Sequence, residues 1–196
     1  MIGSLTGTHA AKHPPWLMLD VGGVGYELEA PMSTFYELPQ IGARLTLVTH
    51  LLVREDAQLL YGFLSDAERV LFRELLKVSG IGARIALAVL SSMSVQGFHQ
   101  CVQNRDIASL VRVPGVGKKT AERLLVEMPD RLSGSVPNGK AGATIPAAQP
   151  ANEAESALLA LGYRQAEITR MLGSLDTVGL STEALIREAL RQVHSG

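Results

Sequence analysis

The spacing of apolar and polar positions along the chain changes once, near residue 65. Before that point, short runs of aliphatic and β-branched residues are separated by glycine-rich turns, which is the pattern of β-strands. Arg54 to Ala57 interrupts two apolar runs as the tip of a hairpin does, and Gly22, Gly23 and Gly25 allow a tight turn or bulge. About five strands in roughly sixty residues favour a small closed barrel over an open sheet.

From Ser65 onward the apolar positions follow the period of a helix. Ser65 and Glu68 form an S-x-x-E capping box, which predicts a helix start at this point. Further short helices with Gly or Pro between them are expected as far as Met128 to Leu132. This part of the chain is therefore predicted to be a compact helical domain.

The pattern is lost and then returns in the last third of the chain. Residues 133–152 collect Gly, Pro, Ala and Asn without periodicity, which predicts a linker. The remainder predicts amphipathic helices, with Gly162 and Gly173 as stops and Ser181 as an N-cap. The predicted domains are 1–64, 65–132 and 153–196, joined across the 133–152 linker.

Composition excludes several classes of protein. No apolar run approaches the ~18 residues of a membrane-spanning helix, and the N-terminus lacks the basic and apolar regions of a signal peptide. The single cysteine, Cys101, can form neither an internal disulfide nor a four-cysteine metal site. We expect a cytoplasmic protein with no membrane association, no metal and no cofactor.

Charge is distributed unevenly along a chain whose net charge is only −1. Residues 1–64 carry a net charge of −3, whereas residues 65–134 carry ten basic and seven acidic side chains, a net charge of +3. A basic segment within a slightly acidic chain indicates a polyanionic partner for that segment.

The central segment contains an internal repeat. LLKVSGIGARIALAVL (75–90) aligns with LVRVPGVGKKTAERLL (110–125) at a constant offset of 35 residues. Each copy has an apolar helix end, a Gly-aliphatic-Gly turn and a second helix, the pattern of a helix-hairpin-helix. Glycines let backbone amides approach an anion closely, and the helix N-terminus adds unpaired amides and a positive dipole end. Two tandem copies predict a surface that binds DNA phosphates.

Basic side chains strengthen this prediction. Lys118 and Lys119 begin the second helix of the second copy, where the helix dipole disfavours a cation by about 0.3 to 1 kcal/mol. Arg84 is the equivalent of Lys119 in the first copy, and Arg123 lies one turn further on. An unfavourable local placement suggests that an external anion supplies the compensating charge.

Other interpretations of VPGVGKKT fit less well. A Walker A loop fails because position 112 is arginine and Lys119 occupies the Ser/Thr position, and Leu28 breaks the G-x-G-x-x-G pattern in GGVGYEL. The stretch also resembles the hairpin of base-excision DNA glycosylases, in which Lys119 would be the nucleophile. The assisting aspartate expected about eighteen residues later is absent, because position 137 is proline and Asp130 is too near. A DNA glycosylase or lyase remains the alternative hypothesis.

With the repeat in place, the chain resembles the RuvA family of bacterial Holliday junction branch-migration subunits. The resemblance rests on MIGSLTG, DVGGVGYELEAP, REDAQLLYGF, VSGIGAR, VPGVGKKTAERLLVEM, LLALGY and ALIREALRQV. It implies a multidomain α+β protein with an N-terminal OB-fold barrel, a tandem helix-hairpin-helix domain and a C-terminal three-helix, UBA-like bundle.

The resemblance also implies roles for particular residues. Glu55 and Asp56 would form an acidic pin that repels phosphates at the junction centre. The apolar candidates for contact with the RuvB motor are Leu158, Leu161, Tyr163 and Leu190, although core packing explains each leucine equally well. The expected phosphate-binding residues are Ser79, Gly80, Gly82, Arg84, Gly115, Gly117, Lys118, Lys119 and Arg123.

These roles together imply a DNA-binding scaffold with no catalytic site of its own. It would bind a four-way junction as a homotetramer, or as an octamer, and would hold the junction in an open form. It would also recruit the hexameric RuvB ATPase for branch migration. The RuvC resolvase is a further candidate partner. The implied processes are DNA recombination, DNA repair and the SOS response to DNA damage. An adaptor for another nuclease or ligase, without preference for junctions, is a third hypothesis.

Overall fold

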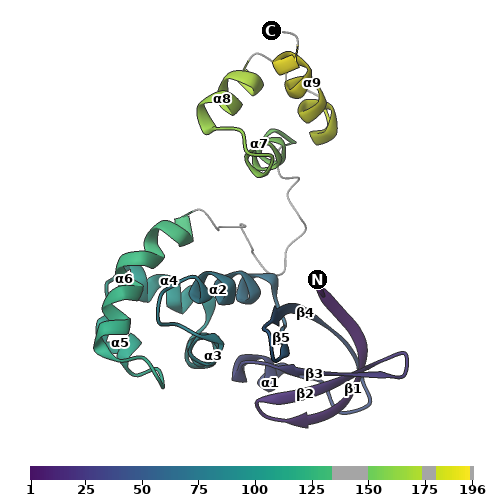
Figure 1. Cartoon of the computed structure of the whole chain (residues 1–196), viewed down its shortest axis with the longest axis vertical. Helices are drawn as coiled ribbons and strands as arrows, with labels where there is room; N and C mark the ends of the chain where they lie inside the picture. Colours follow the sequence, from purple (N-terminus) through teal and green to yellow (C-terminus); the bar gives the residue numbers. More distant parts are fainter. Residues whose placement is uncertain (134–149, 174–179, 195–196) are drawn as a thin grey trace. The chain divides into compact units, whose positions relative to one another are not determined.

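The computed structural model describes residues 1–133, 150–173 and 180–194, which form two compact units divided at residue 139 (Figure 1). Most of the predicted linker, residues 134–149, lies outside the described residues. Each unit is described by itself below.

The first unit begins with a closed five-stranded barrel in the order β1-β2-β3-β5-β4, as predicted from the strand pattern (Figure 1). All neighbouring strands are antiparallel except β3 and β5, which are parallel. The strands are β1 (Ser4–His13), β2 (Trp16–Val21), β3 (Val24–Glu29), β4 (Arg44–Val53) and β5 (Gln58–Phe63). Alternating residues such as Leu17, Leu19, Leu28 and Leu47 point inward and fill the barrel core.

A short helix that the pattern did not predict, α1 (Met32–Glu37), lies between β3 and β4 in the sequence. It contacts the helical domain through two hydrogen bonds. The Met32 amide donates to Ser91 Oγ at 2.9 Å, and the Ser33 hydroxyl donates to Glu68 Oε1 at 2.9 Å. This helix therefore ties the barrel to the helices that follow.

The predicted capping box at the start of the helical domain is confirmed. The Glu68 amide donates to Ser65 Oγ at 3.2 Å, and the Ser65 amide donates to Glu68 Oε2 at 3.2 Å. The helices of this domain are α2 (Asp66–Leu76), α3 (Ala83–Ser92), α4 (Val95–Gln103), α5 (Ile107–Val111) and α6 (Lys118–Ser133). Their buried faces form one apolar core, which continues into the barrel through Tyr61 and Phe63.

The contact between barrel and helices is aromatic at its centre and charged at its edge. Phe72 of α2 packs against Tyr61 and Phe63, with ring centroids 4.9 and 5.0 Å apart. Arg69 Nη1 donates to the carbonyl oxygens of Gly3 at 2.8 Å and Thr49 at 3.4 Å. These contacts fix the barrel and the hairpin helices in one geometry.

No single helix among the described residues is long and apolar enough to cross a membrane. Helices α3 and α4 reach that length and hydropathy only when taken together, and they meet at a bend of 95°. Their apolar residues, including Leu87 and Phe98, lie in the core of the helical domain.

The second unit is a small helical bundle of α7 (Pro150–Ala160), α8 (Gln165–Gly173) and α9 (Thr182–His194). Its core contains Leu158, Ile168, Met171 and Ala189. Pro150, inside the stretch predicted as linker, is already part of α7, and Pro is well tolerated in the first turn of a helix. The predicted stop at Gly162, where φ is +94°, and the Ser181 cap are confirmed, the latter by a bond from the Ala184 amide to Ser181 Oγ at 3.3 Å. Gly173 is the last described residue of α8.

Candidate nucleic-acid interface

The two copies of the repeat fold into turns of the same geometry. In the first turn, the Val78 amide donates to the Leu75 carbonyl at 3.0 Å and the Ile81 amide donates to the Val78 carbonyl at 3.1 Å. The second turn repeats both bonds at positions 35 residues later, at 3.1 and 3.0 Å. The aliphatic residues of each turn are buried, so the turn backbone rests on the core and its glycines face outward.

Each turn contains two glycines with different structural requirements. Gly80 and Gly115 have φ of +87° and +86°, in the left-handed region that favours glycine. Gly82 and Gly117 do not have positive φ, and a Cβ on either would meet nothing within 4 Å. The fold therefore leaves the second position of each turn free of any steric need for glycine. A close approach by an external group would explain glycine at these two positions.

The helix that follows each turn presents an N-terminus and exposed cations. The first intrahelical bonds run from Ala86 to the Gly82 carbonyl at 3.0 Å and from Ala121 to the Gly117 carbonyl at 2.9 Å. The amides of the first turn of each helix therefore have no intrahelical acceptor. Arg84, Lys118 and Lys119 are all exposed at these helix starts. Amides, dipole and cations thus gather at the same two places, which is the arrangement that binds phosphate.

Two of the predicted phosphate-binding residues contact each other. Arg123 Nη1 donates to the Ser79 carbonyl oxygen at 2.6 Å, so this carbonyl is covered and the guanidinium is held across the first turn. Arg123 Nε also lies 4.0 Å from Glu127 Oε1. A guanidinium has five N–H donors, so others remain for a phosphate. Sequence reasoning missed this contact because the repeat offset pairs equivalent positions and carries no information on contacts between the copies.

The acidic pair lies where the sequence predicted a hairpin tip. The β4–β5 turn is closed by a bond from the Arg54 amide to the Ala57 carbonyl at 2.8 Å. Glu55 and Asp56 are exposed at this tip, and neither pairs with a basic side chain within the described part of the chain. Two unneutralised carboxylates on a narrow hairpin repel other anions.

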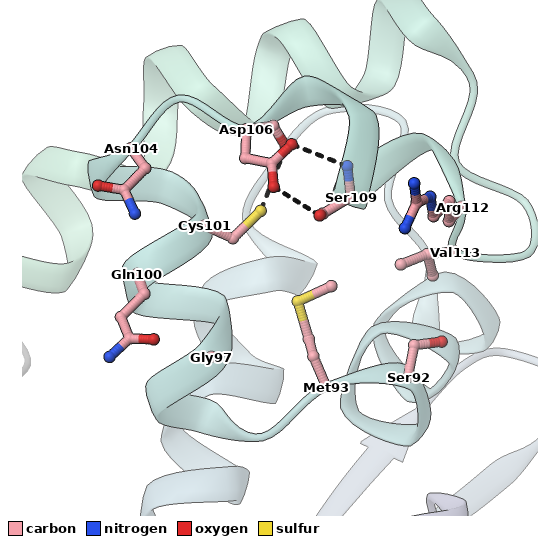
Figure 2. Close-up of a pocket in the computed structure, with 10 residues that line it drawn as sticks. All are labelled: Ser92, Met93, Gly97, Gln100, Cys101, Asn104, Asp106, Ser109, Arg112 and Val113. Carbon is pink, nitrogen blue, oxygen red and sulfur yellow. Dashed lines mark hydrogen bonds between the residues drawn. The ribbon is translucent and has the colours of Figure 1, made fainter.

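A cavity of about 440 Å³ opens beside the second turn, at the end of α3 and between α4 and α5 (Figure 2). Within it Asp106 caps α5, and its carboxylate accepts hydrogen bonds from the Ser109 amide at 3.0 Å and the Ser109 hydroxyl at 2.5 Å. The Ser109 hydrogen bonds lower the pKa of Asp106, whereas burial raises the pKa of the Cys101 thiol. The lining residues are Ser92, Met93, Gly97, Gln100, Cys101, Asn104, Asp106, Ser109, Arg112 and Val113.

The chemistry of this cavity does not make it an active site. Asp106 is engaged in capping, and the Cys101 thiol stays protonated and donates to the Asp106 carbonyl at 3.3 Å. None of the predicted phosphate-binding residues lines the cavity. Two of its polar residues, Asp106 and Ser109, are explained by the cap at the start of α5.

The geometry disfavours lyase chemistry at Lys119. Asp130 lies eleven residues later in the same helix, α6, which separates the two residues by about 16 Å along the helix axis. A carboxylate at that distance cannot assist a reaction at the Lys119 amine. Pro137, the position at which the assisting residue was sought, lies outside the described residues.

The four apolar candidates of the C-terminal bundle differ in exposure. Leu158 is fully buried in the core, so packing accounts for it and it offers no surface for a partner. Tyr163 and Leu190 are half-buried against that core. Leu161 is 62% exposed, as the sequence-based hypothesis requires of a contact residue, and Leu159, which the sequence did not single out, is 46% exposed.

Comparison with known protein families covers most of the chain. The RuvA N-terminal domain matches residues 1–62, a SAM-like helix-hairpin-helix tandem matches residues 72–128, and the RuvA C-terminal domain matches residues 149–194. The three matches follow the order of the barrel, the two hairpins and the bundle.

Relatives match this chain over nearly its whole length. The Holliday junction branch migration complex subunit RuvA of Thioalkalivibrio sulfidiphilus is 54% identical over 198 residues, covering 97% of this chain and 98% of the relative. The proteins of the same name from Methylococcus capsulatus and Nitrosococcus oceani are 53% and 52% identical, and they cover 97% and 98% of this chain and 98% and 100% of their own. With the barrel, the paired hairpins and the bundle in the same order, this chain belongs to the RuvA family.

Proposed function

We propose that this protein is the DNA-binding, non-catalytic subunit of a branch-migration complex that acts on Holliday junctions. The observation that carries this proposal is the duplicated turn, in which the exposed glycines Gly82 and Gly117 adjoin exposed cations at two helix N-termini. Such a surface contacts the phosphate backbone and carries no sequence readout, so it selects DNA by shape. The relatives' name, branch migration complex subunit, supports the same role.

The proposal includes assembly around the junction. A homotetramer would match the four arms, with one pair of hairpins on each arm. The exposed carboxylates of Glu55 and Asp56 would then gather at the centre, where they repel phosphates and keep the separating strands apart. An octamer of two stacked tetramers is compatible with the same contacts.

The proposed partner in strand movement is the RuvB hexameric ATPase. The exposed Leu161 and the half-buried Tyr163 offer it an apolar contact on the C-terminal bundle, and Leu190 lies at the edge of the same core. RuvC resolvase is a further proposed partner on the junction. The proposed setting is the cytoplasm, in DNA recombination and repair and in the SOS response.

The test is the dependence of junction binding on salt. The double variant Lys118→Ala, Lys119→Ala should bind a four-way junction more weakly, and the slope of log K against log salt should become less steep by about one to two units, since fewer counterions are released. A gel-shift titration at several salt concentrations, with a linear duplex of equal length as control, measures both quantities.

Two outcomes would count against the proposal. Equal affinity for junction and duplex in the unmodified protein would favour a general DNA adaptor. A covalent product with abasic-site DNA after borohydride treatment, lost in Lys119→Ala, would favour a lyase.

A further inference from the structure

Each hairpin turn is backed by a side chain from the other copy of the repeat. A Cβ at Gly80 would lie 3.6 Å from Arg123 Nη1 of α6, and a Cβ at Gly115 would lie 3.5 Å from Ile85 Cγ1 of α3. Each copy thus supports the turn of the other, but the two supporting side chains differ in chemistry. The second turn rests on an aliphatic side chain, whereas the first turn is held by a hydrogen bond from a charged guanidinium to the Ser79 carbonyl.

Arg123 is the end of a continuous series of ion pairs. Glu127 lies 4.0 Å from Arg123 and 3.8 Å from Arg131, and Arg131 lies 3.9 Å from Glu74 of α2. The series ends in a pair of 2.6 Å between Glu74 and Lys77. We call these five residues the Arg123 network: Arg123, Glu127, Arg131, Glu74 and Lys77.

The network connects one face of α6 to the backbone that leads into the first turn. Its α6 members are spaced four residues apart, so they lie in one row along the helix. At one end Arg123 holds the Ser79 carbonyl, and at the other lies Lys77, the residue that caps α2 two positions before Ser79. Both termini of the network therefore lie at the same short stretch of backbone, immediately before the glycines of the first turn.

We propose that the Arg123 network is a positioning device for the first hairpin. Arg123 fixes the Ser79–Gly80 backbone, and Glu127 and Arg131 orient Arg123 from the same helix. Arg123 then affects DNA binding mainly by holding the backbone of the first turn in place. This inference rests on the proposed function, because it explains how one of the two proposed phosphate-binding turns is kept in position.

One substitution distinguishes this positioning role from an effect of net charge, because the two predict changes in DNA affinity of opposite sign. Glu127 is an anion on the helix that presents Lys118 and Lys119, so its neutralisation should strengthen binding to DNA if only net charge matters. If Glu127 instead orients Arg123, the isosteric change Glu127→Gln should weaken binding. Glu122 is the matched control, an exposed carboxylate on the same helix that forms no ion pair within 4.0 Å among the described residues.

The experiment compares Glu127→Gln with Glu122→Gln in the full-length protein, using a four-way junction at fixed salt. We expect Glu127→Gln to weaken binding about two- to fivefold, the range of one exposed ion pair, and Glu122→Gln to leave it unchanged or slightly tighter. Urea unfolding of both variants provides the control for folding. Binding by Glu127→Gln that is as tight as binding by Glu122→Gln, or tighter, would overturn the proposal.

A second measurement locates the effect at the first turn. In double-mutant cycles, Glu127→Gln should couple more strongly to Arg84→Ala, beside the first turn, than to Lys119→Ala, beside the second. Equal coupling, or stronger coupling to Lys119, would contradict a role in positioning the first turn. If the Lys118 and Lys119 variant leaves the salt slope unchanged, the proposed phosphate surface itself fails, and that result is independent of these two comparisons.

Discussion

Glycine has two different uses within each hairpin turn, and they respond differently to an added methyl group. At Gly115, φ is +86°, a conformation in which an L-residue is strained by roughly 1–2 kcal/mol. At Gly117 the backbone is free of that strain and the space around the Cβ position is empty. The first glycine is needed by the fold, whereas neither backbone strain nor crowding explains the second.

This difference predicts unequal effects on stability with the same direction of effect on binding. Gly117→Ala should change the free energy of unfolding by less than about 1 kcal/mol, because alanine restricts the unfolded chain but is a poorer residue than glycine at the start of a helix. It should nevertheless weaken junction binding, since the methyl group stands between the amides and a phosphate. Urea unfolding and gel-shift titration measure the two effects. Gly115→Ala is the contrasting variant, expected to lose both stability and binding. Unchanged junction binding by Gly117→Ala would place the phosphate elsewhere.

His50 is a titratable side chain at the contact between barrel and helices, so we expect this contact to depend on pH. Its Nδ1 accepts a hydrogen bond from Arg73 Nε at 3.2 Å, so this nitrogen carries no proton. The ring also packs against Phe72, with centroids 5.6 Å apart. Burial lowers the pKa of His50 below its ordinary value of 6.5, and the nearby Arg73 and Arg69 lower it further. Protonation would remove the acceptor and add a third cation to the cluster.

The consequence is a loss of stability in mild acid. Below pH about 6.5 the unfolded chain binds a proton at His50 before the folded protein does, so the free energy of unfolding falls as pH falls toward the folded pKa. His50→Asn keeps an acceptor for Arg73 but does not titrate, and it should flatten this dependence. Urea unfolding between pH 8 and pH 5 compares the two proteins. Parallel curves for both would show that His50 does not contribute.

Elements with strong local signals could be predicted from the sequence, and elements held by distant contacts could not. The helix at Ser65 was predicted because its capping box lies within four residues, and the two turns were predicted because each repeats the other. Helix α1 has only six residues, too few to show a period, and Pro31 gives it no side-chain cap. It is held by hydrogen bonds to Ser91 and Glu68, which lie far along the chain. Such distant contacts leave no signal in the local sequence pattern.

The dependence of α1 on α3 can be measured at one hydroxyl. Ser91 Oγ accepts from the Met32 amide at 2.9 Å and itself donates to the Leu87 carbonyl. Ser91→Ala should lower the free energy of unfolding by about 1–2 kcal/mol, because it leaves a part-buried amide without a partner. Ser92→Ala is the matched control, since the Ser92 hydroxyl bonds only to the Ala88 carbonyl of its own helix among the described residues. Equal losses in the two variants would show that the contact with α1 contributes nothing.

At the scale of the whole molecule, the segments for which the sequence predicts different functions have separate cores. The basic hairpins and the acidic tip belong to the unit that ends at residue 139, and the bundle has its own core of Leu158, Ile168, Met171 and Ala189. Patterns could predict a phosphate surface, because its glycines and lysines are visible in the sequence whatever their exposure. They could not separate Leu158 from Leu161, because one helical period serves both a core leucine and a surface leucine, and only the packed bundle decides which is which.

Because the two units have independent cores, we expect that a change in the bundle can abolish strand movement without affecting junction binding. Removal of residues 150–196 deletes the entire bundle and none of the core that supports the hairpins, so affinity for a four-way junction and its salt dependence should stay unchanged. ATP-driven branch migration with RuvB should be lost, because the proposed apolar contact is gone. Leu161→Asp in the full-length protein should reproduce that loss without altering the bundle core, since Leu161 is 62% exposed. Migration that persists in both variants would mean that the motor contacts the first unit, where Tyr36 and Ile41 are exposed apolar side chains outside the hairpins and the strands.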